Sequence, residues 1–295
     1  MTIADIATLA ARQLPRARDD SPQYVRPLKN LGVLRHHRRT SFEAAIYEPV
    51  VILILQGRKE TVLGGKSFPM SVGECLLVSH DLPVVARVTK TPYLALIFDV
   101  ERETLRELYE AMAEPLPPAA HSRSLAVHAC AAPLVDALHR CLALASVPMD
   151  AAVLGPLVSR EIHYRLATAP FGGMLRDLIR NDSHASAIAR AIALLRRDFR
   201  EPIEVPRLAR SVGMSASSFH KHFKGITASS PLQYRKSLQL LEARRLLRAG
   251  TLSVTETAFH VGYESAAQFS RDYSRKFGNS PKHDASRARL ANEAS

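Results

Sequence analysis

The chain has 295 residues, of which 46% are apolar and 23% are charged. This length allows two ordinary domains, each with its own hydrophobic core, and the composition excludes a largely disordered protein. No apolar run approaches the roughly 20 residues of a membrane span, and the first 20 residues lack the unbroken apolar core of a secretory signal. We therefore expect a soluble protein of the cytoplasm with no membrane partner.

The positive charge is concentrated in the last third of the chain. Residues 1–185 contain 21 Lys and Arg against 19 Asp and Glu, whereas residues 186–295 contain 19 against 9, a net charge of +10. This asymmetry indicates a polyanionic partner for the basic part, either nucleic acid or an anionic membrane surface. Charge alone does not choose between the two.

The N-terminal half is predicted to form a small β-barrel or sandwich. From Phe42 to about Val100, runs such as AIYEPVVILILQ and YLALIFDV are rich in β-branched or apolar residues, and turn signals such as LGGK and VGE separate them. One of these runs, CLLVS, begins at Cys75. This cysteine is a candidate sensor of electrophiles, although a cysteine in a strand more often only fills the core.

Helical periodicity follows the β region. ERETLRELYEAM, APLVDALHRCLALA and GPLVSREIHYRLA place apolar residues three and four positions apart, as amphipathic helices do, and the first domain is expected to close near Ala169. A proline and two glycines at 170–173 and a cap-like cluster at 181–183 indicate a linker. The rest is predicted to be helical, with breaks at Gly213, Gly225, Gly250, Gly262 and Gly278.

Two stretches of this helical part repeat each other. VPRLARSVG, which begins at Val205, matches VTETAFHVG, which begins at Val254, with an offset of 49 residues, and the offset becomes 50 after the glycine. The alignment pairs Ala209 with Ala258, Gly213 with Gly262, Ser215 with Ser265, Phe219 with Phe269, and Phe223 with Tyr273. Each copy therefore predicts a helix, a glycine-containing turn and a second helix.

Local signals support these two units. A glycine suits the left-handed residue that ends a helix, and SVTE and SAAQ fit the capping box that begins one. Aromatic residues four positions apart lie on one helix face. We expect this face to be buried, so that the residues between the aromatics point outward.

Two helix-turn-helix units on one basic domain are the expected form of a DNA-binding protein whose second helices enter the major groove. A helix predicted from about Leu232 to Ala249 separates the units, and its 18 residues span about 27 Å. A rod of this length can hold two recognition helices near the ~34 Å repeat of one DNA turn. One chain could then contact two successive major grooves.

The motif LARSVGMSASSFHKHFK, followed by SPLQY, EARRLL and TETAFHVGYESAAQFSRDYSRKFGNSP, resembles the DNA-binding domain of AraC-type transcriptional regulators over about 95 residues. YEPVVILILQGRK, LGG, DLPV, PYLAL and REIHYRLA occur in the order typical of a branch with a cupin-like sensor domain. The resemblance implies a multidomain α+β fold, with an N-terminal cupin-like β-barrel and dimerising helices before an all-α domain with two helix-turn-helix units. We expect an extension at 1–24, a sensor and dimerisation domain at 25–169, a linker at 170–185, a DNA-binding domain at 186–285 and a tail at 286–295.

The resemblance also implies which residues contact DNA. The positions from which the family contacts bases correspond to Ser217, His220 and Lys221 in the first recognition helix and to Ala267, Gln268 and Arg271 in the second. Ser215 and Ser265 are expected to cap these helices, whose N-termini also attract phosphate. Arg271 could contact guanine or could be a solvated surface residue, and the same two alternatives apply to a base contact by His220. Lys221 could contact phosphate instead of a base.

The sequence departs from the family pattern in two places. Gln239 stands where the family usually has an arginine in its linker helix, and PKHDA replaces a Pro-x-x-Tyr-Arg-like ending. Ala267 in addition has no hydrogen-bonding group. We therefore expect the second unit to bind DNA less specifically than the first.

The N-terminal histidines raise the alternative of a metal-dependent cupin. His36 and His37 are adjacent, His80 is isolated, and His121 and His128 lie seven residues apart. None of them forms an HxH pair with a downstream carboxylate and histidine, and the three cysteines form no CxxC pair. We therefore expect no metal, no cofactor and no enzymatic activity.

The sequence thus predicts a transcriptional regulator that binds double-stranded DNA, senses a small molecule in its barrel and forms a homodimer through its N-terminal domain, with RNA polymerase as a further partner. Two alternatives stay open. One is a ligand-independent DNA-binding dimer, and the other is a metal-dependent cupin enzyme fused to a DNA-binding module.

Overall fold

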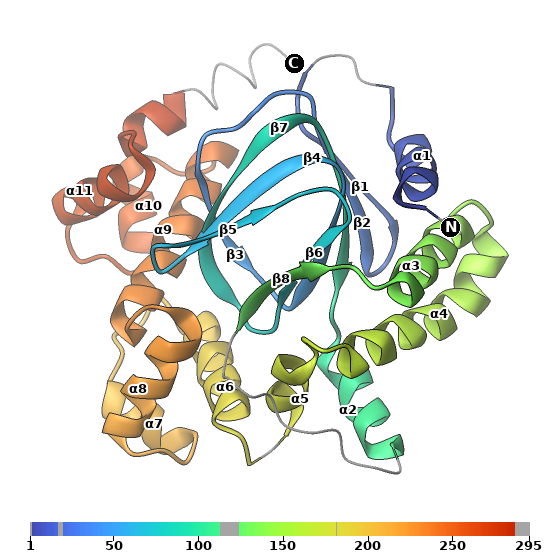
Figure 1. Ribbon diagram of the computed structural model, residues 1–295. Coiled ribbons are helices and arrows are strands. Elements are labelled where there is room, and N and C mark those ends of the chain that lie inside the picture. The colour runs from blue at the N-terminus through green and yellow to red at the C-terminus, as the bar shows by residue number, and fades with distance from the viewer. Residues whose placement is uncertain (1, 17–19, 113–123, 181, 287–295) are drawn as a thin grey trace. The chain divides into compact units, whose positions relative to one another are not determined.

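The computed structural model describes residues 2–16, 20–112, 124–180 and 182–286. His121, part of the 181–183 cluster and most of the expected tail lie outside these ranges. The chain divides into two compact units (Figure 1). The N-terminal unit comprises Met1–Phe42 and Tyr47–Ser186, and the C-terminal unit comprises Ala187–Ser295 together with Glu43–Ile46.

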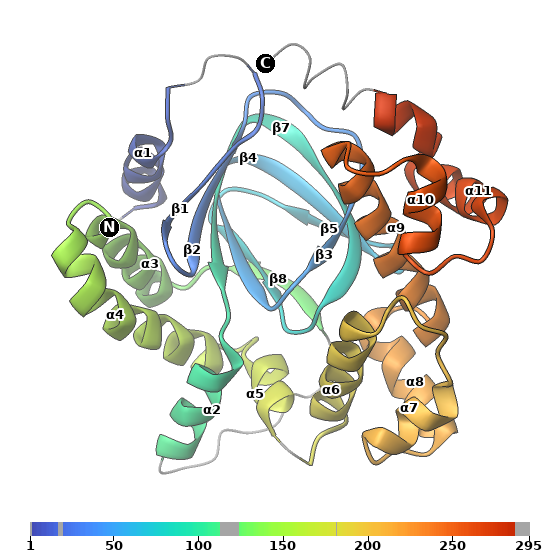
Figure 2. The same cartoon turned by 180° about the vertical axis from the view of Figure 1, so that it is seen from behind.

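The N-terminal unit is built on a strongly curved antiparallel sheet (Figures 1 and 2). The strands of the chain are β1 (Gln23–Leu28), β2 (Leu31–His36), β3 (Glu43–Tyr47), β4 (Val50–Leu63), β5 (Lys66–Met70), β6 (Glu74–Val78), β7 (Leu82–Asp99) and β8 (Leu125–Ala129). The sheet runs in the order β1-β2-β7-β4-β6-β8, and β5 pairs with β4. The run AIYEPVVILILQ includes the first half of β4, and YLALIFDV includes the second half of β7, the two long central strands.

Helices cover one face of this sheet. They are α1 (Ile3–Gln13), α2 (Arg102–Ala111), α3 (Ala132–Leu144), α4 (Pro148–Thr168) and α5 (Gly173–Ile179). Alternate strand residues such as Val51, Leu53 and Leu96 are buried in one core with Leu138 of α3 and Ile162 of α4. The apolar side chains that alternate along the strands therefore pack against the apolar faces of the helices in one layer.

The same core includes two segments outside the expected sensor domain. Helix α1, in the expected extension, buries Ile6 and Ala10 there, and α5, in the expected linker, buries Met174, Leu175 and Ile179. Arg176 is also buried and donates a hydrogen bond of 2.6 Å to the carbonyl of Ala167 at the end of α4. Both helices thus pack as parts of the N-terminal unit.

The C-terminal unit is helical, with α6 (His184–Arg197) leading into α7 (Val205–Ser211), α8 (Ala216–Thr227), α9 (Pro231–Ala249), α10 (Val254–His260) and α11 (Ala266–Phe277). An N-terminal sheet unit followed by a helical unit confirms the predicted fold class. Within the described ranges, no helix has both the length and the apolar character needed to span a membrane.

The predicted break at Gly225 is wrong. Helix α8 continues to Thr227, and Ala228 is the left-handed cap with φ of 56°. The helix continues because Ile226 and Thr227 are buried and the Thr227 hydroxyl donates a hydrogen bond of 2.8 Å to the carbonyl of Phe223. The other four glycines have positive φ and lie where helices end.

His80, considered above as a metal ligand, is a buried core residue. Its Nε2 donates to the carbonyl of Ala185 at 3.0 Å, and its Nδ1 accepts from the Ser79 hydroxyl at 2.8 Å. Burial lowers the pKa of His80 from 6.5 to about 4. The ring is therefore neutral in the folded protein.

This burial predicts a loss of stability in weak acid. Below pH 6.5 the unfolded chain binds a proton that the folded chain does not bind, so the free energy of unfolding falls as the pH drops from 6.5 to about 4. We expect His80 to contribute about 2 to 3 kcal/mol to this fall. Denaturant unfolding across this range should show a shallower pH dependence for His80→Gln than for the wild type. Equal pH profiles for His80→Gln and the wild type would refute the assignment.

Candidate nucleic-acid interface

The first helix-turn-helix unit consists of α7 and α8. Its turn is held by hydrogen bonds of 3.0 Å from Gly213 N to the carbonyl of Arg210 and from Met214 N to the carbonyl of Ala209. Helix α8 then begins at Ser215, whose hydroxyl accepts from Ser218 N at 3.3 Å. The turn and the cap fix the direction in which the second helix leaves the first.

The turn of the second unit, α10 and α11, is held by the two equivalent hydrogen bonds. Gly262 N donates to the carbonyl of Phe259, and Tyr263 N donates to the carbonyl of Ala258, again at 3.0 Å. Ser265 caps α11 by accepting from Gln268 N at 3.3 Å. SVTE at the start of α10 forms a complete capping box, whereas SAAQ forms only the half in which Ser265 accepts.

An aromatic pair anchors each recognition helix to the core. Phe219 and Phe223 of α8 are fully buried, with ring centroids 5.4 Å apart, and Phe269 and Tyr273 of α11 are fully buried, with centroids 5.5 Å apart. The prediction that these positions face the core is confirmed. Neither helix can rotate about its axis without exposing two rings.

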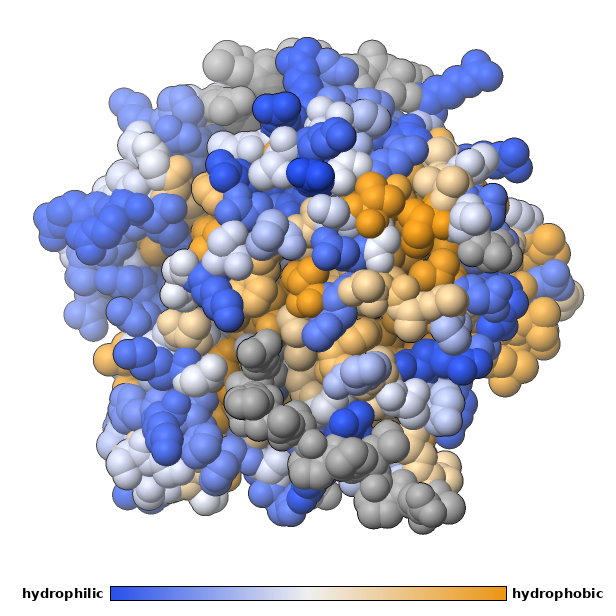
Figure 3. Space-filling model, in the orientation of Figure 1, coloured by the Kyte–Doolittle hydropathy of each residue, from blue (hydrophilic) through white to orange (hydrophobic). Residues whose placement is uncertain are grey.

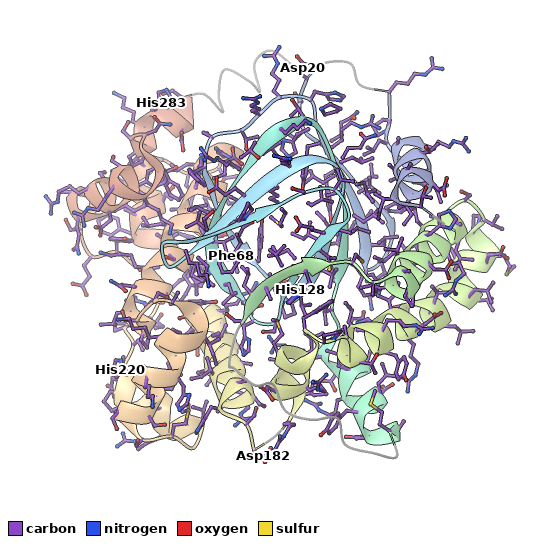
Figure 4. All side chains as sticks on the ribbon, viewed as in Figure 1. Asp20, Phe68, His128, Asp182, His220 and His283 are labelled. Carbon is purple, nitrogen blue, oxygen red and sulfur yellow. The ribbon has the colours of Figure 1, made fainter. Side chains whose placement is uncertain are left out.

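Burial of the rings leaves the opposite face of each helix in solvent. All six residues assigned to base contacts are exposed: Ser217, His220 and Lys221 on α8, and Ala267, Gln268 and Arg271 on α11. Figure 4 labels His220 on α8. The cap residues Ser215 and Ser265 are exposed beside them. Each recognition helix therefore presents the predicted residues on one accessible face.

Two further cations, which the sequence pattern did not indicate, lie on these faces. Lys224 lies one turn beyond Lys221, and Arg275 lies one turn beyond Arg271, and both are exposed. The i, i+3, i+7 spacing from Ser217 and from Gln268 was the signal that could have identified them. The Arg275 guanidinium lies 3.7 Å from the Asp272 carboxylate, and the Arg275 side chain is 78% exposed.

The departure at Gln239 has a structural explanation. Gln239 of α9 is buried, and its Nε2 donates to the carbonyls of Val261 at 2.9 Å and Gly262 at 3.2 Å. These carbonyls belong to the turn of the second unit. A neutral amide therefore holds this turn on the connecting helix.

The departure at the C-terminal end also has a structural explanation. Asp284, within PKHDA, is buried and accepts a hydrogen bond of 2.8 Å from the Tyr273 hydroxyl. Arg244 of α9 lies 3.4 Å from the same carboxylate. Asp284 thus joins the segment that follows α11 to both the second recognition helix and the connecting helix.

The described cysteines and histidines of the N-terminal unit form no comparable site. Cys75 is buried beside Cys130, and the hydrogen bond between their thiols lowers the pKa of Cys75 and raises that of Cys130. His128 of β8 stacks on Phe171, with ring centroids 4.8 Å apart. Over the part of the chain that the structure describes, no three His, Cys, Asp or Glu side chains are grouped so as to hold a metal ion.

Comparisons with known proteins agree with this architecture. A family model described as AraC-type transcriptional regulator N-terminus matches residues 27–174, and a helix-turn-helix domain model matches residues 208–287. The chain is 31% identical over 101 residues to the HTH-type transcriptional activator RhaS of Escherichia coli O157:H7, covering 34% of this chain and 36% of RhaS. It is 27% identical over 152 residues to the HTH-type transcriptional regulator GbdR of Pseudomonas aeruginosa, covering 47% of this chain and 41% of GbdR. The chain thus spans less than half the length of these curated relatives.

Solved structures show the same fold. ToxT from Vibrio cholerae strain SCE256, with an unsaturated fatty acid bound, superposes with a TM-score of 0.59 at 10% identity, covering 90% of this chain and 96% of ToxT. ToxT from Vibrio cholerae O395 bound to (E)-4-(8-methylnaphthalen-1-yl)but-3-enoic acid gives a TM-score of 0.52 at 11% identity, covering 88% of this chain and 100% of that ToxT chain. At these identities the likeness concerns the fold alone.

The two turn glycines predict a pair of unequal substitutions. Both have positive φ, 77° at Gly213 and 84° at Gly262. A Cβ at Gly213 would meet no atom within 4 Å, whereas a Cβ at Gly262 would overlap the backbone carbonyl of Arg200. Gly213→Ala should therefore lower the free energy of unfolding by about 1 to 2 kcal/mol, and Gly262→Ala by about 3 kcal/mol or more.

Thermal and denaturant unfolding of both variants of the full chain measures this difference. Equal losses would contradict the close approach of Arg200 to the second turn.

Proposed function

Because the chain belongs to the AraC-type transcriptional regulators, we propose that it is a sequence-specific DNA-binding regulator whose two helix-turn-helix units contact adjacent major grooves. The observation that carries this proposal is the repeated unit itself. Both recognition helices bury an aromatic pair and expose polar side chains, and they lie within residues 186–295, which carry a net charge of +10. This charge favours a phosphate backbone, because each neutralised phosphate releases counterions.

The two recognition helices offer different chemistry to DNA. Helix α8 presents His220 and Lys221, whereas α11 presents Gln268 and Arg271 beside Ala267, which has no polar group. An arginine can donate two hydrogen bonds to the O6 and N7 atoms of guanine, and a glutamine can pair with adenine. We assign a base contact to Arg271 and a phosphate or base contact to Lys221. The caps at Ser215 and Ser265 place helix N-termini where phosphates bind.

We further propose that the N-terminal unit is the sensor of a cytoplasmic regulator. The family match covers residues 27–174, from β1 into α5. The sensor and dimerisation domain would comprise the predicted segment 25–169 together with α1 and α5, which share its core, and the DNA-binding domain would follow. A small molecule bound to this unit would bias the protein between states with different DNA affinity. RNA polymerase is the partner that an activator of this type would contact.

A homodimer through α4 is supported by the surface of that helix. Met149, Val153 and Leu157 lie four residues apart and are 72%, 59% and 62% exposed. Leu154 and Tyr164 extend the same apolar surface, at 42% and 43% exposed. Figure 3 shows apolar side chains, coloured orange, at the margin of the N-terminal unit where α4 lies. Contiguous apolar patches of this kind mark protein interfaces, and a second copy can cover the stripe with its own α4.

Substitutions on the two recognition helices test the assignment of base contacts. Arg271→Ala should weaken binding to the preferred site by about 1 to 3 kcal/mol and relax the preference at one base pair, because a bidentate guanine contact is lost. If Lys221 meets phosphate, Lys221→Ala should instead weaken all sequences alike and reduce the salt dependence. Selection of binding sites from random DNA with the wild type and both variants measures this. An unchanged preferred sequence for Arg271→Ala, with affinity lost equally on random DNA, would falsify its role in base recognition.

The dimer predicts a monomeric variant. Leu157→Glu places a carboxylate in the middle of the apolar stripe, so we expect it to shift the chain from dimer to monomer in analytical ultracentrifugation. Val72→Glu is the matched control, because Val72 is an exposed valine of the same unit that lies outside α4, at 51% exposed. A wild-type chain that is monomeric at micromolar concentration, or a Leu157→Glu variant that stays dimeric, would exclude this interface.

A further inference from the structure

A buried carboxylate lies in the middle of the second recognition helix. Asp272 is the only acidic residue of α11, and its side chain is 9% exposed. Lys236 of α9 places its Nζ 2.7 Å from Asp272 Oδ2, and the Tyr263 hydroxyl, from the turn before α11, donates to the same oxygen at 3.4 Å. The Arg275 guanidinium lies 3.7 Å from Asp272 Oδ1. A carboxylate with so little exposure to water requires such partners, because an unpaired buried charge is costly.

The two cations of this cluster are accessible to solvent, whereas the carboxylate is not. The Lys236 side chain is 43% exposed, and Arg275 is exposed one turn beyond Arg271 on α11. Cations on the surface of a DNA-binding unit neutralise phosphates and release counterions. Asp272 offers both cations a negative charge within the protein. It therefore competes with DNA phosphate for them, and more strongly for Lys236, which is the closer of the two.

The first recognition helix lacks this arrangement. The repeat pairs Asp272 with His222, and α8 contains no acidic residue. Its cations Lys221 and Lys224 are exposed on the face that carries the residues assigned to base contacts. The two units therefore differ in how positive charge is balanced within the recognition helix, and not only in the residues that would contact bases.

We propose that Asp272 is a positioning residue that makes DNA binding by the second unit more specific, because it keeps Lys236 and Arg275 paired and so limits their contacts with phosphate. The inference rests on the proposed function, since it concerns how the second unit selects its site. Phosphate contacts carry no sequence information, and specificity is a difference between two affinities. A residue that limits phosphate contacts therefore changes specificity wherever those contacts differ between the two kinds of DNA.

Free cations would favour random DNA over the preferred site for two reasons. At the preferred site the base contacts fix the position of α11, so released cations can reach fewer phosphates there than on random DNA, where the helix is free to shift. The carboxylate also joins α11 to α9 and to the turn at Tyr263, which orients Arg271. Loss of this link would weaken the base contact and leave phosphate contacts intact.

Asp272→Asn in the full chain tests this proposal. The amide keeps the size of the side chain and can still accept from the Tyr263 hydroxyl, but it has no charge with which to hold the two cations. We expect the affinity for a random duplex to rise about 3- to 10-fold, and the slope of log affinity against log salt to become steeper by about 0.9 for each released cation. The affinity for the selected site should rise less, so the ratio of the two affinities should fall. Fluorescence anisotropy over a series of salt concentrations measures both affinities, and circular dichroism checks the fold.

Asp198→Asn is the matched control. Asp198 follows α6 in the same unit and forms an exposed ion pair of 2.7 Å with Arg197. The substitution removes the same charge and releases an arginine, but outside both recognition helices. It should leave the ratio of the two affinities unchanged.

Lys236→Gln gives a second test that decides the matter even if Asp272→Asn does not fold. Because Lys236 is already paired, Lys236→Gln alone should leave the salt slope on random DNA unchanged. Added to Asp272→Asn, it should remove about 0.9 of the increase in slope.

The proposal is overturned if Asp272→Asn leaves the ratio of the two affinities unchanged, if Asp198→Asn lowers that ratio equally, or if Lys236→Gln alone reduces the salt slope by about 0.9. Each of these outcomes leaves the proposed function standing, because the wild type still binds its selected site. A wild type that binds no DNA would refute the proposed function and this inference together.

Discussion

The arrangement of the DNA-binding unit depends on the burial of one aromatic pair in each recognition helix. Phe219 and Phe223 in α8 and Phe269 and Tyr273 in α11 are completely enclosed. Full burial of such a side chain contributes about 1.5 to 3 kcal/mol, so rotating either helix would cost more than a surface contact can recover. The exposed side chains between the rings are therefore held in one orientation before DNA is met.

Helix α9 transmits this constraint from one unit to the other. Its Tyr234 packs against Phe223 of the first unit, with ring centroids 5.6 Å apart. Its Gln239 donates a hydrogen bond to the turn of the second helix-turn-helix unit. Its Arg244 lies beside the carboxylate of Asp284. Arg235 donates to the carbonyls of Phe199 and Arg200, the latter beside Gly262. One helix thus contacts both helix-turn-helix units. Such a shared contact is needed to keep the two recognition helices at a fixed spacing.

Much of the C-terminal unit could be predicted from the sequence because its signals are local. The repeat, the turn glycines and the aromatic spacing each specify a backbone geometry within a few residues. The break predicted at Gly225 was wrong because a glycine permits a helix to end but does not require it. The burial of Ile226 instead favours one more turn of α8. In the N-terminal unit, the core positions of Ile6 and Leu175 depend on long-range packing.

The central claim is that one chain places two recognition helices in successive major grooves of the same DNA face. Hydroxyl-radical footprinting of the monomeric Leu157→Glu variant on its selected site tests this directly. We predict two protected patches per chain, about 10 base pairs apart. A single patch, or two patches about half a helical turn apart, would contradict it.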